Sequence, residues 1–162
     1  MYLKKLSLTD DIRHFHLLQA IGKSENGFKN EVKNDTYAQF QQWLNKAEEE
    51  SHTNFGNEKV VPQTTYWLWD EGQLVGIGRI RHRLNDKFAK SGGNLAYAIA
   101  KDKRGRGYGN HLLDLLLRQC KVLNVNPIQC SVQRKNVVSN KIVLKNGGHL
   151  YLQTNTENIY RW

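Results

Sequence analysis

Hydrophobic and polar residues alternate at the start of the chain and then follow a helical period. The alternation in Tyr2–Leu8 predicts a short strand. In Asp11–Gly22 the apolar residues recur at helical spacing behind the start signals Thr9 and Asp10, which predicts a helix. A second helix is predicted to begin after Asp35, an N-cap residue type, and to end in an acidic run. Its apolar face carries Tyr37, Phe40, Trp43, Leu44 and Ala47.

The pattern then changes to the period of β-structure. Gln63–Asp70 is β-branched and aromatic, and Gln73–Leu84 follows it across the tight-turn signal Glu71-Gly72, which predicts an antiparallel hairpin. Asn94–Ala100 is predicted to be a third strand. The leucine-rich run Asn110–Leu123 has helical spacing, which predicts a helix with one face in the core.

The C-terminal part continues with shorter elements. Pro127–Gln133 is predicted to be a strand, and Val137–Lys145 a short helix that ends before two glycines. His149–Thr154 and Asn158–Trp162 read as two final strands. Three polar segments are predicted to be loops: Ser24–Asn34, His52–Lys59 and Asn85–Gly93.

This order predicts an α/β fold in one domain over residues 1–162. We expect a mixed, mostly antiparallel twisted sheet flanked by helices. At its centre, the strands Asn94–Ala100 and Pro127–Gln133 are expected to be parallel and joined by the helix between them, through a right-handed crossover.

Composition and charge narrow the class of protein. The 162 residues include 24 Lys and Arg against 15 Asp and Glu, a net charge of +9, which suits an anionic partner such as a nucleic acid, a membrane surface or a phosphate-bearing cofactor. The basic residues are spread along the chain and no nucleic-acid motif is present, so we expect no nucleic-acid partner. No apolar run approaches the roughly 20 residues of a membrane span, and the first residues lack the apolar region of a signal peptide. We therefore expect a cytoplasmic protein that does not bind a membrane.

The two cysteines, Cys120 and Cys130, do not have the spacing of metal ligands or of a disulfide framework. We interpret them as buried free thiols and expect no metal site.

The stretch "RGRGYG", Arg104–Gly109, lies between a predicted strand and a predicted helix. The first backbone N–H groups of a helix lack intrahelical partners, and the helix dipole adds positive potential there, so such a turn binds anions. Glycines allow the backbone to bend and a phosphate to come close. The stretch matches neither the P-loop nor the dinucleotide-binding pattern. A phosphate or pyrophosphate is the expected ligand.

The segment "LAYAIAKDKRGRGYGNHLLDLLL" resembles the acetyl-CoA-binding segment of the GCN5-related N-acetyltransferase (GNAT) superfamily. In that family an arginine or glutamine, two residues, a glycine, one residue and a glycine or alanine follow a strand and open a helix. Arg104, Gly107 and Gly109 match these positions. Asn136 and Ser139 match a second family feature after the next strand. The resemblance implies the acyl-CoA N-acyltransferase fold.

The resemblance also implies a set of cofactor-binding residues. The backbone from Gly105 to Gly109 would hold the pyrophosphate of acetyl-CoA, and Arg104 or Arg106 would reach a phosphate. Tyr108 would either stack near the cofactor or pack beside the helix. The pantetheine arm would pair with the strand edge, and Asn136 and Ser139 would lie beside it. The residues of that edge are Ala98, Ile99, Ala100 and Lys101.

Catalytic groups are harder to assign. The resemblance implies that the backbone N–H of Ile99 stabilises the oxyanion. Many family members carry a tyrosine as general acid seven residues after the asparagine, but Val143 occupies that position here. Alternative acids are Tyr97, Tyr151, Tyr160 or a water molecule. Candidates for the base are His82 and Asp86.

The sequence therefore predicts an acetyl-CoA-dependent N-acetyltransferase that transfers an acetyl group directly to a primary amine of a small molecule, peptide or protein. The fold does not name this acceptor. Two alternatives are a catalytically silent acyl-CoA-binding sensor and a basic nucleic-acid-binding protein. The protein is expected to be a monomer or a homodimer.

Overall fold

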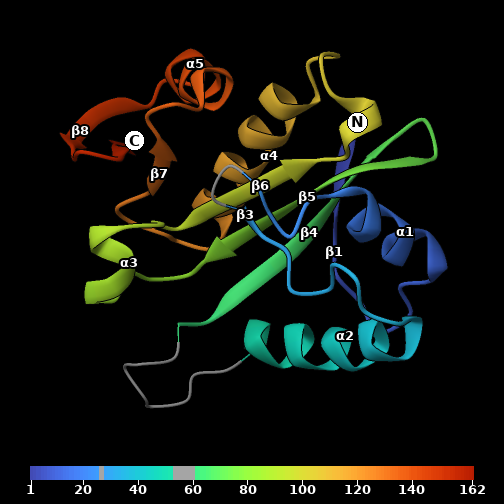
Figure 1. The fold of residues 1–162 in the computed structure, drawn as a ribbon. Coiled ribbons are helices and arrows are strands. Elements are labelled where there is room, and N and C mark those ends of the chain that lie inside the picture. Colours follow the sequence, from blue (N-terminus) through green and yellow to red (C-terminus); the bar gives the residue numbers. More distant parts are fainter. Residues whose placement is uncertain (26–27, 53–60) are drawn as a thin grey trace.

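The computed structural model describes residues 1–25, 28–52 and 61–162 (Figure 1). Its main sheet has four strands in the order β1-β4-β5-β6, and every neighbouring pair is antiparallel. The strands are β1 (Tyr2–Lys5), β4 (Gln63–Asp70), β5 (Gln73–Arg81) and β6 (Leu95–Ile99). The hairpin predicted around Glu71-Gly72 is therefore confirmed, and β6 is the edge strand that borders the site described below.

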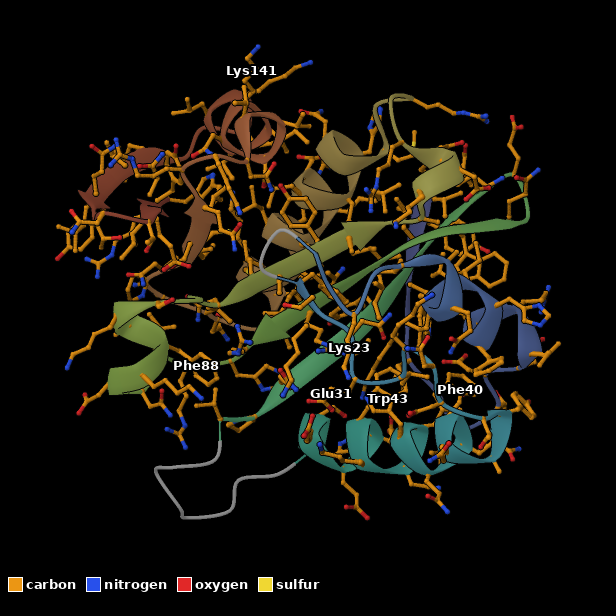
Figure 2. All side chains as sticks on the ribbon, in the orientation of Figure 1. Lys23, Glu31, Phe40, Trp43, Phe88 and Lys141 are labelled. Carbon is orange, nitrogen blue, oxygen red and sulfur yellow. The ribbon has the colours of Figure 1, made fainter. Side chains whose placement is uncertain are left out.

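One face of this sheet is covered by α1 (Ile12–Ala20) and α2 (Tyr37–His52). Phe40 and Trp43 of α2 point from the helix toward the sheet (Figure 2), where Trp67 and Ile77 are fully buried. Alternate residues of a strand face opposite sides of a sheet, so these residues of β4 and β5 lie on one side. The aromatic residues of β4, Tyr66, Trp67 and Trp69, are all buried.

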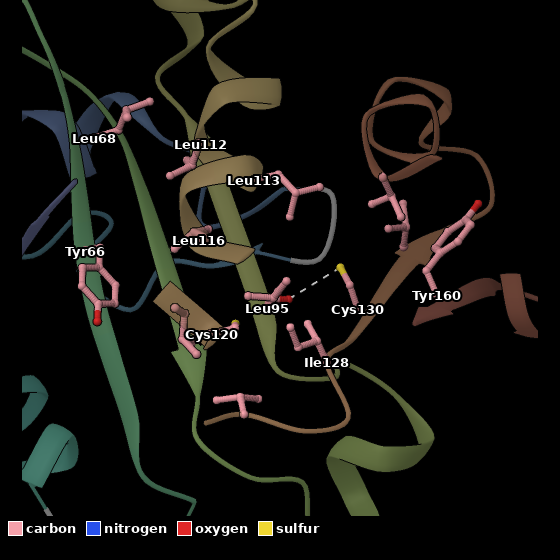
Figure 3. Close-up of a cluster of buried hydrophobic side chains, with 14 of the residues drawn as sticks. Tyr66, Leu68, Leu95, Leu112, Leu113, Leu116, Cys120, Ile128, Cys130 and Tyr160 are labelled. Carbon is pink, nitrogen blue, oxygen red and sulfur yellow. Dashed lines mark hydrogen bonds between the residues drawn. The ribbon is translucent and has the colours of Figure 1, made fainter. Parts of the chain in front are cut away.

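The other face is covered by α4 (Tyr108–Val122). Its leucines Leu112, Leu113 and Leu116 are fully buried (Figure 3). Gly78 of β5 permits this close packing, because a Cβ added there would lie 2.7 Å from a methyl group of Leu116. At Gly76 the crowding comes from β6, since a Cβ added there would lie 2.6 Å from Cδ1 of Ile99. The predicted core face of the helix is confirmed.

The C-terminal part forms a second sheet in the order β7-β9-β8, made of β7 (Gln129–Gln133), β8 (His149–Gln153) and β9 (Glu157–Arg161). The helix α5 (Val137–Lys145) connects β7 to β8. β6 and β7 belong to different sheets, and an isolated antiparallel bridge joins Gly93, just before β6, to Cys130 of β7. In Figure 3 their ribbons then run in the same general direction and diverge. The strand–helix–strand unit is present, but its strands separate instead of forming a parallel ladder.

Several local predictions need correction. Ser24–Asn34 contains the two-residue strands β2 (Ser24–Glu25) and β3 (Phe28–Lys29). Asn85–Gly93 contains the short helix α3 (Asp86–Lys90), because the Asn85 side chain accepts a hydrogen bond from the Phe88 N–H at 3.0 Å and so caps it. The loop predicted at His52–Lys59 lies outside the described residues apart from His52, which ends α2.

The N-terminus of α2 is capped by Thr36 instead of the predicted Asp35. Thr36 Oγ1 accepts from the Gln39 N–H, and the Gln39 side chain accepts from the Thr36 N–H. This reciprocal arrangement is a capping box, and the sequence T-x-x-Q contains it.

Among the described residues, no helix is long and apolar enough to cross a membrane.

Candidate functional site

A cavity of about 540 Å³ lies between β6 and α5, next to the glycine turn. Its walls come from β6, the glycine turn, the start of α4 and the first turns of α5. The lining residues are Tyr97, Ala98, Ile99, Lys103, Arg104, Gly105, Gly107, Tyr108, Gly109, Asn110, Asn136, Val138, Ser139 and Ile142. The list includes every residue predicted to bind the cofactor except Ala100, Lys101 and Arg106.

The backbone direction of β6 follows from its pairing with β5. The Ala100 N–H donates to the Val75 carbonyl at 3.2 Å, and the Arg81 N–H donates to the Asn94 carbonyl at 2.8 Å. Positions with hydrogen bonds to the partner alternate with positions without them along an antiparallel strand. The even-numbered residues of β6 therefore bond to β5, and the backbone groups of the odd-numbered residues point away from it.

The odd-numbered backbone groups lie on the edge where β6 and β7 separate. Cys130 of β7 contacts the Leu95 carbonyl at 3.8 Å, which confirms this direction at the start of the strand (Figure 3). Farther along, the N–H groups of Tyr97 and Ile99 share the same orientation. The Ile99 carbonyl already accepts a hydrogen bond from Arg104 Nε at 3.1 Å, and the Ile99 N–H points to the same edge.

The glycine turn has the backbone shape of an anion-binding loop. Gly105 and Gly107 have φ angles of 77° and 82°, in the left-handed region that favours glycine. A Cβ added at either one would meet no atom within 4 Å, so the space beside both glycines is open. Gly107 is the N-cap residue of α4 and makes no side-chain cap hydrogen bond. The first N–H groups of a 15-residue helix therefore border open space.

Gly109 has a different role from the two glycines before it. A Cβ there would lie 3.0 Å from Cδ1 of Ile142 on α5. Gly109, the third glycine of the turn, thus allows α4 and α5 to approach each other at the cavity wall.

Cationic side chains surround this turn. Arg104 and Lys103 line the cavity, whereas Lys101 and Arg106 are exposed beside it. The Lys103 ammonium donates to Gln73 at 3.0 Å. Among the described residues that line the cavity there is no Asp, Glu or His. The cavity therefore suits an anionic ligand.

The opposite wall is formed by the N-terminal turn of α5. The Asn136 side-chain oxygen accepts from the Ser139 N–H at 3.1 Å and caps the helix, which leaves the two N–H donors of its NH₂ group for a ligand. Ser139 Oγ lies 2.9 Å from the hydroxyl of Tyr97. Burial raises the pKa of Tyr97 well above its ordinary value, and the nearby Cys130 raises it further. Tyr97 is therefore protonated at neutral pH.

The structure places the other candidate acids and bases outside the cavity lining. His82 follows β5 at the opposite end from Gly76, which pairs with Ile99, and it hydrogen bonds to Thr64. Burial lowers the pKa of His82, and Lys5 lowers it further. Asp86 is exposed on α3.

Neither of the two C-terminal tyrosine candidates lines the cavity. Tyr151 is exposed on β8, with the guanidinium of Arg161 3.5 Å from its ring centre. Tyr160 is buried and donates its hydroxyl proton to Asn140 at 2.6 Å. Val143, at the position of the family's tyrosine, is fully buried in the core around α4.

Both cysteines are buried and free, as predicted. Burial raises the pKa of Cys120 and of Cys130 to about 12. A thiol with such a pKa is a poor nucleophile at neutral pH. The geometry therefore gives no support to an acyl-cysteine route.

Sequence reasoning missed four lining residues: Lys103, Asn110, Val138 and Ile142. Val138 and Ile142 are one helical turn apart in α5, and this i, i+4 apolar pair was visible in the sequence. Asn110 accepts a hydrogen bond from Asn146 at 3.1 Å, a contact between α4 and α5 that no local pattern signals.

The sequence matches the family model described as "Acetyltransferase (GNAT) domain" over residues 2–149. The protein thus belongs to the GNAT family of acetyltransferases. A search of curated protein sequences found no significant match.

Solved structures of acetyltransferases have the same fold as this chain. The Campylobacter jejuni N-acetyltransferase PseH in complex with acetyl coenzyme A has a TM-score of 0.67 at 13% identity, covering 99% of this chain and 96% of that one. The GNAT domain of S. lividans PAT has a TM-score of 0.68 at 12% identity, covering 99% and 89%. A chimera of spermidine N-acetyltransferase SpeG from Vibrio cholerae and hSSAT has a TM-score of 0.65 at 14% identity, covering 99% and 93%. The N-acyltransferase fold expected from the sequence is confirmed.

Proposed function

We propose that this protein is an acetyl-CoA-dependent N-acetyltransferase that acetylates a primary amine directly. The observation that carries the proposal is one cavity bordered by the glycine turn and by the odd-numbered edge of β6. A ligand with a pyrophosphate at one end and a thioester at the other fits such a pair of sites. The match over residues 2–149 and two core clusters on the faces of one sheet support a single catalytic domain.

In this proposal each wall of the cavity has its own task. The backbone from Gly105 to Gly109, at the positive end of α4, binds the pyrophosphate, and the Arg104 guanidinium adds charge. Asn136 contacts the pantetheine arm through its NH₂ group. Bound acetyl-CoA supplies an activated acetyl group as a thioester. The N–H of Ile99 donates to the acetyl carbonyl oxygen and stabilises the negative charge that develops on it.

The amine must be neutral when it attacks. Since no described residue that lines the cavity carries a carboxylate or an imidazole, we assign removal of the amine proton to water. The scarcity of acidic groups also argues against a strongly cationic acceptor. A small molecule, peptide or protein with a single reactive amine is the class that we propose.

The cofactor assignment is tested by charge reversal in the glycine turn. In Gly107→Glu a carboxylate would enter the open space beside the helix N-terminus, so acetyl-CoA binding measured by calorimetry should be lost. Gly147→Glu is a matched control, because Gly147 has a φ of 81° and open space around it but does not line the cavity. Unchanged affinity in Gly107→Glu would exclude the proposed phosphate site. Release of free thiol with a panel of amines and peptides would then identify the acceptor class.

A second candidate function is a catalytically silent acyl-CoA-binding sensor. The observation that favours it is the buried Val143 in place of the family's tyrosine, together with the lack of acidic or histidine groups among the described lining residues. Acetyl-CoA binding without thiol release for any member of a broad amine panel would support the sensor and contradict the enzyme.

A further inference from the structure

The hydroxyl groups of Tyr97 and Ser139 form a pair across the cavity. Tyr97 lies on β6 and Ser139 lies on the first turn of α5, and their oxygens are 2.9 Å apart. Both residues line the cavity. This pair joins the strand that carries the proposed oxyanion donor to the helix that lacks the family's tyrosine.

We propose that Tyr97 Oη donates a proton to the sulfur that leaves when the acetyl group is transferred, in place of the acid that Val143 cannot supply. This inference rests on the proposed function, and it assigns a catalytic residue to the same site. The glycine turn and the β6 edge account for cofactor binding, and Tyr97 would account for protonation of the leaving sulfur.

The position of Tyr97 relative to Ile99 carries the argument. The two residues are separated by one position on the same strand, so their N–H groups point to the same edge and their side chains lie on the same face. The thioester sulfur is bonded to the carbon whose oxygen would accept from the Ile99 N–H. A sulfur atom held there lies in the part of the cavity that the Tyr97 side chain lines.

The hydrogen bond to Ser139 leaves the phenolic proton available. Either hydroxyl can donate in this pair. With the Ser139 hydroxyl donating to Tyr97 Oη, the Tyr97 proton is directed to a ligand, and the developing phenolate retains one hydrogen bond. Burial keeps Tyr97 protonated at neutral pH, which a general acid requires before the step.

The step balances in atoms and charge. The nitrogen–carbon bond forms, the carbon–sulfur bond breaks, and the electron pair of the broken bond stays on sulfur. The phenolic proton moves from Tyr97 to that sulfur. The proton lost by the amine passes to water, and water returns a proton to the Tyr97 phenolate, so that a free thiol and an amide are the products.

The hydroxyls of Tyr108 and Tyr160 donate hydrogen bonds to other residues. Tyr108 lines the cavity beside the glycine turn, where its hydroxyl donates to Asp70 at 2.9 Å. Tyr160 donates to Asn140, and it does not line the cavity. Among the tyrosines proposed as acids from the sequence, Tyr97 is the one that the described cavity includes.

The first experiment compares Tyr97→Phe with Tyr160→Phe. Each variant loses one hydrogen-bonded hydroxyl, but only Tyr97 lines the cavity. We expect Tyr97→Phe to lower kcat by about 100-fold, the lower end of the range for general acids, because a thiolate is a good leaving group. Acetyl-CoA affinity should change little in both variants, and Tyr160→Phe should keep its kcat. Equal kcat in Tyr97→Phe and the wild type would overturn the proposal.

A second experiment measures binding instead of turnover. Calorimetry compares CoA with desulfo-CoA, which lacks the sulfur atom. The wild type should bind CoA about fivefold more tightly, the value of one modest hydrogen bond, and Tyr97→Phe should lose this preference. Equal affinity of the wild type for both ligands overturns the role of Tyr97 even if the variant does not fold.

The two levels of the proposal fail in different ways. A wild type that binds no acetyl-CoA, or releases no thiol with any amine, overturns the proposed enzyme and the role of Tyr97 together. A wild type that turns over while Tyr97→Phe matches it in kcat and in ligand preference overturns only the role of Tyr97.

Discussion

The hydroxyl of Tyr108 donates a hydrogen bond to Asp70 Oδ2 at 2.9 Å, so the first residue of α4 is attached to the tip of the β4–β5 hairpin. The Lys103 ammonium also donates a hydrogen bond to Gln73, the first residue of β5, on the other side of that hairpin. The glycine turn is therefore held in place from the main sheet at two points. A loop fixed before its ligand arrives binds with a smaller loss of conformational entropy.

Removing the first attachment should weaken binding without unfolding the protein. In Tyr108→Phe the ring remains and the hydrogen bond to Asp70 is lost. We expect a severalfold weaker affinity for acetyl-CoA, measured by calorimetry, and little change in Tm. Asp70→Asn is the control, since its amide retains an oxygen that can accept the same bond. Full affinity in Tyr108→Phe would show that the attachment does not preorganise the turn.

The packing of α4 on β5 gives a prediction about stability. In Gly78→Ala the new methyl group would lie 2.7 Å from the side chain of Leu116, which is fully buried and has little room to move. We expect a loss of about 1–3 kcal/mol in the free energy of unfolding, measured with urea. Adding Leu116→Ala should cost less in the Gly78→Ala background than in the wild type, because the methyl fills part of the new cavity. Strictly additive losses would contradict the close packing.

Restoring the family's tyrosine should not restore its role. Val143 is fully buried, and its Cγ1 would be 2.7 Å from a Cβ at Gly148, so a larger side chain has no space. We expect Val143→Tyr to destabilise the protein by about 1–3 kcal/mol and to leave kcat no higher than in the wild type. Val143→Ile, a smaller enlargement, should cost less. A rise in kcat with unchanged Tm would show that the site accepts an acid from α5.

The buried thiols predict a pH effect. With a pKa of about 12, about one in ten thousand molecules carries a Cys130 thiolate at pH 8, so Ellman's reagent should react slowly with the native protein and quickly in guanidinium.

In the unfolded chain the thiols ionise near their ordinary pKa of 9.0, whereas the folded protein keeps both protons until about pH 12. Stability is therefore lost as pH rises from about 9 toward 12. Fast labelling of the native protein at pH 8 would contradict the burial.

Local patterns in the sequence predicted most of the fold. The spacing of apolar residues, the turn residues and the glycines located the long helices and strands, because each of these signals depends on a few neighbouring residues. The errors fell where a single side chain decides the outcome. Asn85 caps a five-residue helix in a segment that reads as a loop, and Thr36 takes the capping role expected of Asp35. Both caps are visible in the sequence but are weak signals there.

The candidate site was predictable where it depends on backbone shape. Gly105 and Gly107 of the glycine turn border the cavity as expected, but the packing role of Gly109 against Ile142 required the relative placement of two helices. The proton chemistry depends on side chains that are distant in the chain. The contact of Tyr97 with Ser139 joins residues on β6 and α5 that no local pattern connects.

The edge of β6 would recognise its ligand through main-chain amides, and this affects how the site tolerates mutation. An N–H group is common to nineteen of the twenty residue types, so the donor at position 99 survives most replacements of the isoleucine as long as the strand stays paired with β5. The direction of the backbone N–H groups along β6 must be kept, whereas the identity of the side chains there can change. Such a site can be kept while most of the sequence around it drifts.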